Sequence, residues 1–176
     1  LALRGGPERA VAEAAGALGG LDVLVNNVGT ARIAAFEEVG DDEWDDTWQL
    51  NVMSYVRAIR AALPHLRAAG GGAIVNVSST AGKRPSTGMP HYSVTKAAVL
   101  SLSRLVADVY AREGIRCNAV TPGPTATEAW LGDGGLADQQ GNRDEALAKA
   151  AAGRPLGRLA QPGEIAAAVV FLCSAR

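Results

Sequence analysis

The sequence of 176 residues is poor in cysteine, in histidine and in excess charge of either sign. It contains two cysteines and two histidines, and 17 Lys+Arg against 18 Asp+Glu leave a formal net charge of −1. Because no basic patch stands out, nucleic acid is not an expected partner. Cys117 and Cys173 are far apart and predict buried thiols, not a disulfide or a metal pair. The sequence predicts no metal site.

Long hydrophobic runs and a signal peptide are also lacking. No apolar run reaches the roughly 18 residues of a membrane-spanning helix. These absences predict a cytoplasmic protein with no membrane partner. The hydrophobic content of 48% is sufficient for a sizeable core. The length suits one domain over residues 1–176.

Two apolar stretches, at residues 21–25 and 72–79, predict buried strands, and a third strand is expected at residues 115–120. Helices are predicted between them, over residues 7–18, 42–69 and 92–112, and again near the C-terminal end. This alternation is typical of an α/β fold. Asp41 or Asp42 is expected to cap the second helix. Residues 124–153 are predicted to be irregular, either as a mobile substrate lid or as an ordinary surface loop.

Tyr92 and Lys96 stand four residues apart, so they share one face of a helix. An ammonium near a phenol favours the phenolate, so we expect Lys96 to lower the pKa of Tyr92 from about 10. Such a tyrosine suits general acid or base catalysis. Ser79 ends the second strand, where open α/β sheets place their sites. It is placed to hold a carbonyl or alcohol oxygen, although Tyr-x-x-x-Lys alone also fits a half-buried tyrosine beside a solvated lysine.

Two further asparagine positions are notable. Asn26, Asn27, Val28 and Gly29 follow the first strand, where asparagine and glycine tolerate a sharp turn. Asn51 lies inside a predicted helix, a poor place for asparagine by propensity, unless it is a surface residue or a local cap.

Taken in order, these motifs resemble the short-chain dehydrogenase/reductase family. The turn matches its Asn-Asn-Ala-Gly motif with Val28 in place of alanine, and the family's catalytic tetrad matches Asn51, Ser79, Tyr92 and Lys96. The resemblance implies a Rossmann-like, doubly wound parallel sheet in three α/β/α layers. It also implies an oxidoreductase that uses NAD or NADP to interconvert a small-molecule carbonyl and an alcohol.

The resemblance also implies a role for each residue. Tyr92 would exchange the proton, Lys96 would lower its pKa and contact the cofactor ribose, and Ser79 would bind the substrate oxygen. Asn51 would hold a water linked to Lys96. Cofactor contacts are implied for Asn26, Val28, Gly29, Tyr92, Lys96, Pro122, Gly123, Thr125 and Thr127. A homodimer or homotetramer through the helices at 42–69 and 92–112 is expected, and His91 would either face the substrate or cap the loop.

Two elements of the family pattern are missing. A Gly-x-x-x-Gly-x-Gly turn directly after a strand is absent, and so is the last strand. Residues 1–3 are expected to be the remnant of the family's third strand. The sequence thus resembles an internal piece that lacks the first βαβ unit, which would leave residues 21–25 as an exposed apolar edge. The alternative to an enzyme is a truncated, non-catalytic fragment that acts at most as a dimerising module.

Overall fold

Three parallel strands form the middle layer of the structure, a computed structural model that describes residues 5–174. Their order is β1 (Val23–Asn26), β2 (Gly72–Val77) and β3 (Ile115–Val120), with β2 in the centre. Asn26 lies opposite Asn76, and Val77 lies opposite Val120. The carboxyl ends of the strands therefore meet at one edge of the sheet.

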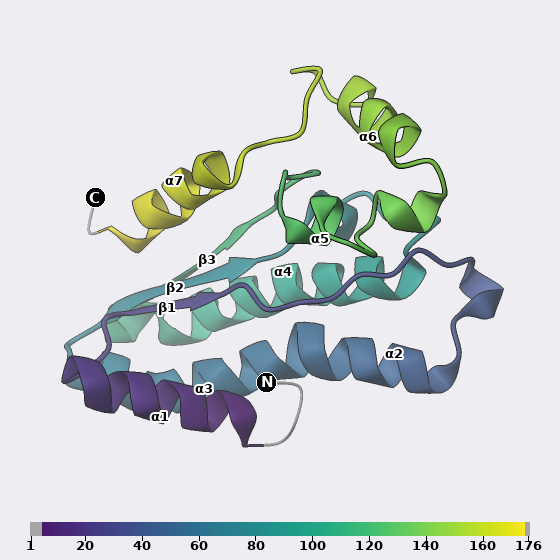
Figure 1. The fold of residues 1–176 in the computed structure, drawn as a ribbon. Helices are drawn as coiled ribbons and strands as arrows, with labels where there is room; N and C mark the ends of the chain where they lie inside the picture. The colour runs from purple at the N-terminus through teal and green to yellow at the C-terminus, as the bar shows by residue number, and fades with distance from the viewer. Residues whose placement is uncertain (1–4, 175–176) are drawn as a thin grey trace.

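Helices cover both faces of this sheet (Figure 1). On one face α3 (Ser54–Ala68) and α4 (Pro90–Tyr110) contact the strands, and α1 (Gly6–Leu18) packs against α3. On the other face α7 (Pro162–Cys173) contacts β2 and β3. The largest buried apolar side chains lie between the first group of helices and the sheet, among them Leu66, Ile74 and Ile115. The predicted three-layer Rossmann-like arrangement is confirmed.

The helix that begins near residue 41 differs from the prediction at its start. The first helical residue of α2 (Asp41–Trp48) is Asp41 itself, and the N-cap is Gly40. The carbonyl of Gly40 accepts hydrogen bonds from the backbone N–H groups of Glu43 and Trp44. The predicted side-chain cap by Asp41 or Asp42 is therefore wrong, and these carboxylates instead lie beside the positive end of the helix dipole.

The segment 124–153 is not irregular, so that prediction is wrong. It contains α5 (Glu128–Leu131), the 3₁₀ turn η5 (Asp138–Gln140) and α6 (Arg143–Ala152). The side-chain oxygen of Asn142 accepts a hydrogen bond from the N–H of Glu145 at 3.2 Å, which caps α6. The glycines that suggested a loop stand between the helices, where they end one and permit the turn to the next.

Apolar side chains of β1, α4 and α7 remain exposed in the described chain, and those of α7 are Val170 and Phe171. Strand β1 is an edge of the sheet, as predicted, and Val23 and Val25 are 39% and 43% exposed. Helix α4 packs one face on the sheet and leaves Leu105 and Val109 exposed on another. The predicted strand remnant at residues 1–3 lies outside the described residues. Of the helices described, none has both the length and the apolarity needed to cross a membrane.

Gly72, at the start of β2, lies in a closely packed part of the sheet. A Cβ atom there would lie 2.4 Å from the carbonyl oxygen of Asp22 and 2.8 Å from Cδ2 of Leu66. Gly72→Ala should therefore lower the free energy of unfolding by about 1–3 kcal/mol, because backbone must move to admit the methyl group. The measurement is urea unfolding followed by circular dichroism.

The matched control is Gly16→Ala in α1, where a Cβ atom meets nothing within 4 Å. This change should raise the free energy of unfolding by about 0.5–1 kcal/mol, because alanine loses less entropy in a helix. Equal effects of the two substitutions would contradict the packing described for Gly72.

Candidate active site

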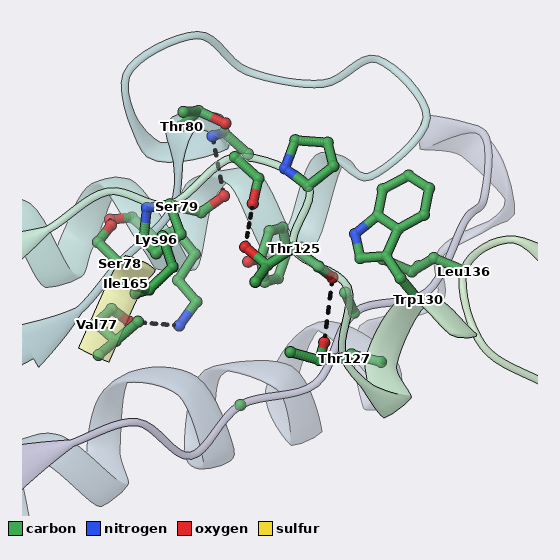
Figure 2. Close-up of a pocket in the computed structure, with 18 of the residues that line it drawn as sticks. Val77, Ser78, Ser79, Thr80, Lys96, Thr125, Thr127, Trp130, Leu136 and Ile165 are labelled. Carbon is green, nitrogen blue, oxygen red and sulfur yellow. Dashed lines mark hydrogen bonds between the residues drawn. The ribbon is translucent and has the colours of Figure 1, made fainter. Parts of the chain in front are cut away.

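A cavity of about 1100 Å³ opens at the carboxyl edge of the sheet. Its lining includes Ser79, Tyr92 and Lys96. Tyr92 and Lys96 are among the implied cofactor contacts, and five more of those positions also line the cavity: Gly29, Pro122, Gly123, Thr125 and Thr127. Figure 2 shows Ser79 and Lys96 on one wall, with Trp130 and Leu136 on the opposite wall.

Ser79 caps the 3₁₀ turn η3 (Thr80–Gly82) directly after β2. Its Oγ accepts a hydrogen bond from the N–H of Ala81 at 3.1 Å. Because the oxygen already accepts, the hydroxyl proton is available for donation to another oxygen. The N–H of Thr80 donates to the carbonyl of Pro122 at 2.9 Å, which fixes this turn against the segment after β3 (Figure 2).

Lys96 is a buried cation on α4 with a side chain only 4% exposed. Its Nζ donates to the carbonyl oxygen of Val77 at 2.9 Å (Figure 2). The same atom lies 5.5 Å from the ring centroid of Tyr55 and 5.7 Å from that of Tyr92. Burial lowers the pKa of Lys96 to about 8. This lysine can therefore exchange its proton near neutral pH.

Tyr92 does not have the lowered pKa that the sequence argument expected. Burial raises the pKa of the phenol, and a hydrogen bond with the Ser79 side chain lowers it by less. The ammonium of Lys96 lies 5.7 Å from the centre of the Tyr92 ring and is not among the causes of the shift, in which desolvation of the phenol is the largest. In this structure Ser79 is the group that favours the phenolate.

Asn51 lies on η2 (Gln49–Met53), a π-helical turn between α2 and α3. Its side chain is fully buried, so it is neither a surface residue nor a local helix cap. Oδ1 accepts from the N–H of Thr30 at 2.9 Å, and Nδ2 donates to the carbonyl of Thr30 at 3.0 Å and to Oγ1 of Thr95 at 3.1 Å. Asn51 thus joins the loop after β1 to the residue that precedes Lys96.

The turn after β1 approaches these two residues closely. A Cβ atom on Gly29 would lie 3.2 Å from Oδ1 of Asn51 and 3.3 Å from Nζ of Lys96. Glycine therefore allows the backbone of the turn to reach the lysine. Asn26 and Val28 lie outside the cavity lining, and the Asn26 amide instead donates to Oδ1 of Asn76 at 2.9 Å. Asn27, which the sequence argument did not select, lines the cavity.

The sequence argument also did not predict the residues of the cavity wall opposite Ser79 and Lys96. Trp130 and Leu136 come from the glycine-rich segment after β3 (Figure 2). Ile165 of α7 was also missed, and Figure 2 shows it on the side of Ser78 and Val77. A large aromatic residue among glycines was the available signal, since a surface loop has no need of a tryptophan.

His91 was expected either to face the substrate or to cap the loop before α4, and it does neither. It is buried, it is not part of the cavity lining, and its ring meets that of Trp44 edge-on at 6.0 Å between centroids. Its Nε2 lies 3.4 Å from Oε1 of Glu43, and Glu43 also pairs with Arg32. Burial lowers the pKa of His91. His91 therefore packs the start of α4 against α2, behind Tyr92.

The cysteines and acidic residues form no cluster at this site. Cys117 and Cys173 are free, and burial raises the pKa of Cys117 to about 11. Within residues 5–174 no group of three or more His, Cys, Asp and Glu side chains is arranged to hold a metal ion.

Comparison with known proteins assigns the chain to a family. The sequence model described as enoyl-(acyl carrier protein) reductase matches residues 5–176. The chain is 41% identical over 168 residues to 4-formylbenzenesulfonate dehydrogenase TsaC1/TsaC2 of Comamonas testosteroni, across 94% of this chain and 65% of the relative. The chain belongs to the short-chain dehydrogenase/reductase family. It is also 41% identical to cis-4-hydroxycyclohexanecarboxylate dehydrogenase of Sinomonas cyclohexanicum, across 95% of this chain and 62% of the relative.

A solved structure of another short-chain reductase supports the same assignment. L-sorbose reductase from Gluconobacter frateurii, complexed with NADPH and L-sorbose, superposes with a TM-score of 0.90 at 36% identity. The match covers 99% of this chain and 68% of the reductase. The chain thus spans about two thirds of the length of the relatives that it matches.

The burial of Lys96 predicts a cost in stability. At pH 7 the folded protein holds an ammonium whose pKa is about 8 instead of 10.5. Replacing it by an apolar residue of similar length, Lys96→Met, should raise the free energy of unfolding at pH 7 by up to roughly 3 kcal/mol. The measurement is urea unfolding at pH 7 and at pH 10.

The sign of the pH dependence follows from the lowered pKa. Between pH 8 and 10.5 the unfolded chain binds the proton of Lys96 more tightly than the folded chain, so the wild type gains stability as the pH rises. The advantage of Lys96→Met should therefore shrink at pH 10. Lys83→Met, at an exposed lysine, should change the stability by less than about 0.5 kcal/mol at either pH. An advantage of Lys96→Met that is the same at both pH values would exclude desolvation as its cause.

Proposed function

We propose that this chain forms the catalytic part of an NAD- or NADP-dependent oxidoreductase that interconverts a carbonyl and an alcohol. The observation that carries the proposal is the convergence of Ser79, Tyr92 and Lys96 on one cavity at the carboxyl edge of a parallel sheet. Two relatives, one named for an aromatic sulfonate and one for L-sorbose, are a dehydrogenase and a reductase. Their names support oxidation or reduction as the reaction type, although the two compounds differ.

The residues around Gly29 fit a nicotinamide cofactor. Gly29 has no side chain at the point where a Cβ atom would lie 3.3 Å from Nζ of Lys96. Within residues 5–174 that ammonium, which can donate three hydrogen bonds, donates one, to the carbonyl of Val77. Lys96 is thus able to donate to ribose hydroxyl groups, while Gly29, Thr125 and Thr127 would line the nicotinamide end. The cofactor, when bound, supplies or accepts the hydride.

The protein residues would manage the proton and the oxygen of the substrate. Ser79 directs its one hydroxyl proton to Tyr92 while the cavity is empty, and would donate it to the substrate oxygen and stabilise charge that develops there once substrate binds. Tyr92 would then give or take the proton of that oxygen. Lys96, with a pKa of about 8, lies beside the ring of Tyr92, and its positive charge would favour the phenolate when the proton leaves. Asn51 holds the backbone of Thr30 and the start of α4 so that these groups keep their places.

Tyr92→Phe tests this assignment, because it removes only the oxygen that exchanges the proton. We expect turnover to fall by at least 10³-fold, while the dissociation constant for NADH or NADPH changes less than threefold. Turnover is followed by nicotinamide absorbance, and cofactor binding by calorimetry. The control, Tyr110→Phe, alters a tyrosine on the far end of α4 and should retain activity. Wild-type turnover by Tyr92→Phe would remove tyrosine from the mechanism.

We also propose that α4 pairs with a second copy of this chain. Its exposed side carries Val94, Ala97, Ser101, Leu105 and Val109, which recur on one face of the helix. Such a face in water favours association through a two-fold axis, in which the helix meets its own copy. This surface would also suit the alternative of a non-catalytic dimerising module. Binding of NADH or NADPH distinguishes the two, because only the enzyme needs it.

Leu105→Glu should turn a dimer into a monomer, because it places a charge in the centre of the apolar face. Light scattering after gel filtration measures the mass. Ala12→Glu, on the exposed side of α1, should leave the dimer intact. A monomeric wild type at micromolar concentration would contradict the proposed pairing.

A further inference from the structure

The residues that line the cavity carry an excess of positive charge, whereas the whole chain has a formal net charge of −1. Four residues of its lining are basic, namely Arg84, Lys96, Lys149 and Arg154, and none is Asp or Glu. Over the whole chain, acidic residues outnumber basic ones by 18 to 17. Only Lys96 has a role in the proposed proton transfer, which leaves three cations at the cavity without a function.

These three cations also lack the partners that other arginines have. Arg32, Arg143 and Arg158 are neutralised by Glu43, Asp138 and Glu164. Within residues 5–174 the side chains of Arg84, Lys149 and Arg154 have no carboxylate within salt-bridge distance and no hydrogen bond. Their charge is therefore available to a ligand. A cleft lined by one sign of charge attracts ions of the opposite sign and raises their local concentration.

Arg84 is the cation nearest in sequence to the catalytic groups, between Ser79 and Tyr92. Its backbone N–H donates to the carbonyl of Thr80 at 2.9 Å, so the turn that fixes Ser79 also fixes Arg84. The next residues are tied to α4, because the N–H of Ser86 donates to Oγ of Ser93 at 3.0 Å. The loop thus anchors the backbone of Arg84, an exposed residue that lines the cavity.

A guanidinium offers two parallel N–H donors that match the geometry of a carboxylate, sulfonate or phosphate. We propose that the substrate is an acid: a carbonyl or alcohol compound with an anionic group that pairs with Arg84. The inference rests on the proposed function for its reaction. Lys149 on α6 and Arg154 after it strengthen the attraction from another part of the cavity wall.

The test compares matched acids and esters, such as 4-formylbenzoate with its methyl ester and 4-oxopentanoate with its methyl ester. For each pair we measure kcat/KM with NADH and NADPH at low and high salt. The wild type should prefer the acid at least tenfold at low salt, and the preference should fall as salt screens the charges. An equal or greater kcat/KM for the esters would overturn the proposal and leave the oxidoreductase function standing.

Substitutions locate the charge that sets this preference. Arg84→Gln should lower the acid-to-ester ratio of kcat/KM at least tenfold, and Arg84→Lys should restore part of it. Arg60→Gln, an exposed arginine of α3 outside the cavity lining, should leave the ratio as in the wild type. Phosphates of the cofactor are the other source of anionic charge. If Arg84→Gln raises the KM for the cofactor and spares the ratio, Arg84 serves the cofactor and the proposal fails.

A binding experiment separates failure of this inference from failure of the proposed function. Trp130 lines the cavity, so its fluorescence reports occupancy, and Trp130→Phe shows which part of the signal belongs to it. Benzoate should bind at least tenfold more tightly than benzamide, and Arg84→Gln should remove the difference. If benzoate binds more tightly than benzamide but no acid or ester is turned over, the anion site is supported and the oxidoreductase function is rejected. Equal binding of the two compounds would reject the anion site.

Discussion

The side chain of Asn51 is the contact on which the arrangement of the site depends. One amide satisfies both backbone groups of Thr30 and the hydroxyl of Thr95, so it joins the loop after β1 to the first turns of α4. A fully buried amide that lost these partners would carry the full cost of desolvation. Asn51 lies on a π-helical turn, which widens the helix at one point and directs the side chain toward the loop. Such turns are frequent at functional sites. The position of Lys96 therefore depends on hydrogen bonds made by its neighbour in sequence.

Much of this molecule could be predicted from sequence where local pattern and burial agree. The strand expected at residues 115–120 became β3 with the same bounds, and Ser79 was rightly placed at the carboxyl end of β2. The pKa of Tyr92 could not be predicted in the same way, because it depends on how much water surrounds the phenol. A spacing of four residues brings a lysine near a tyrosine, but the depth at which both are buried is a property of the tertiary fold. Helix α6 was missed for a related reason, since its cap at Asn142 is a single residue among glycines that suggest a loop.

The two walls of the cavity differ in how they are built. The wall with Ser79, Tyr92 and Lys96 comes from the end of β2 and from α4, which are held by the sheet and by the buried core, while Asn51 lies behind it on η2. The other wall includes α5 and α6, short helices joined by glycines, with ion pairs such as Arg143 with Asp138 between them. Changes in the second wall can alter the shape and charge of the cavity without moving the groups that transfer the proton. This division allows one fold to serve many substrates.

The amide pair between Asn26 and Asn76 has a consequence for how the chain folds. Both side chains are buried and directly opposite in the parallel ladder, and Asn76 also donates to Oγ of Ser103 at 2.9 Å. If β1 slid by one residue along β2, Asn26 would turn to the opposite face, and Oδ1 of Asn76 would lose its hydrogen-bond donor in an apolar interior. Valine pairs tolerate such a shift far better, since one apolar contact replaces another. The hydrogen bond between the two asparagines therefore favours the native register of β1 on β2. It disfavours sheets with a shifted register while the chain is still folding.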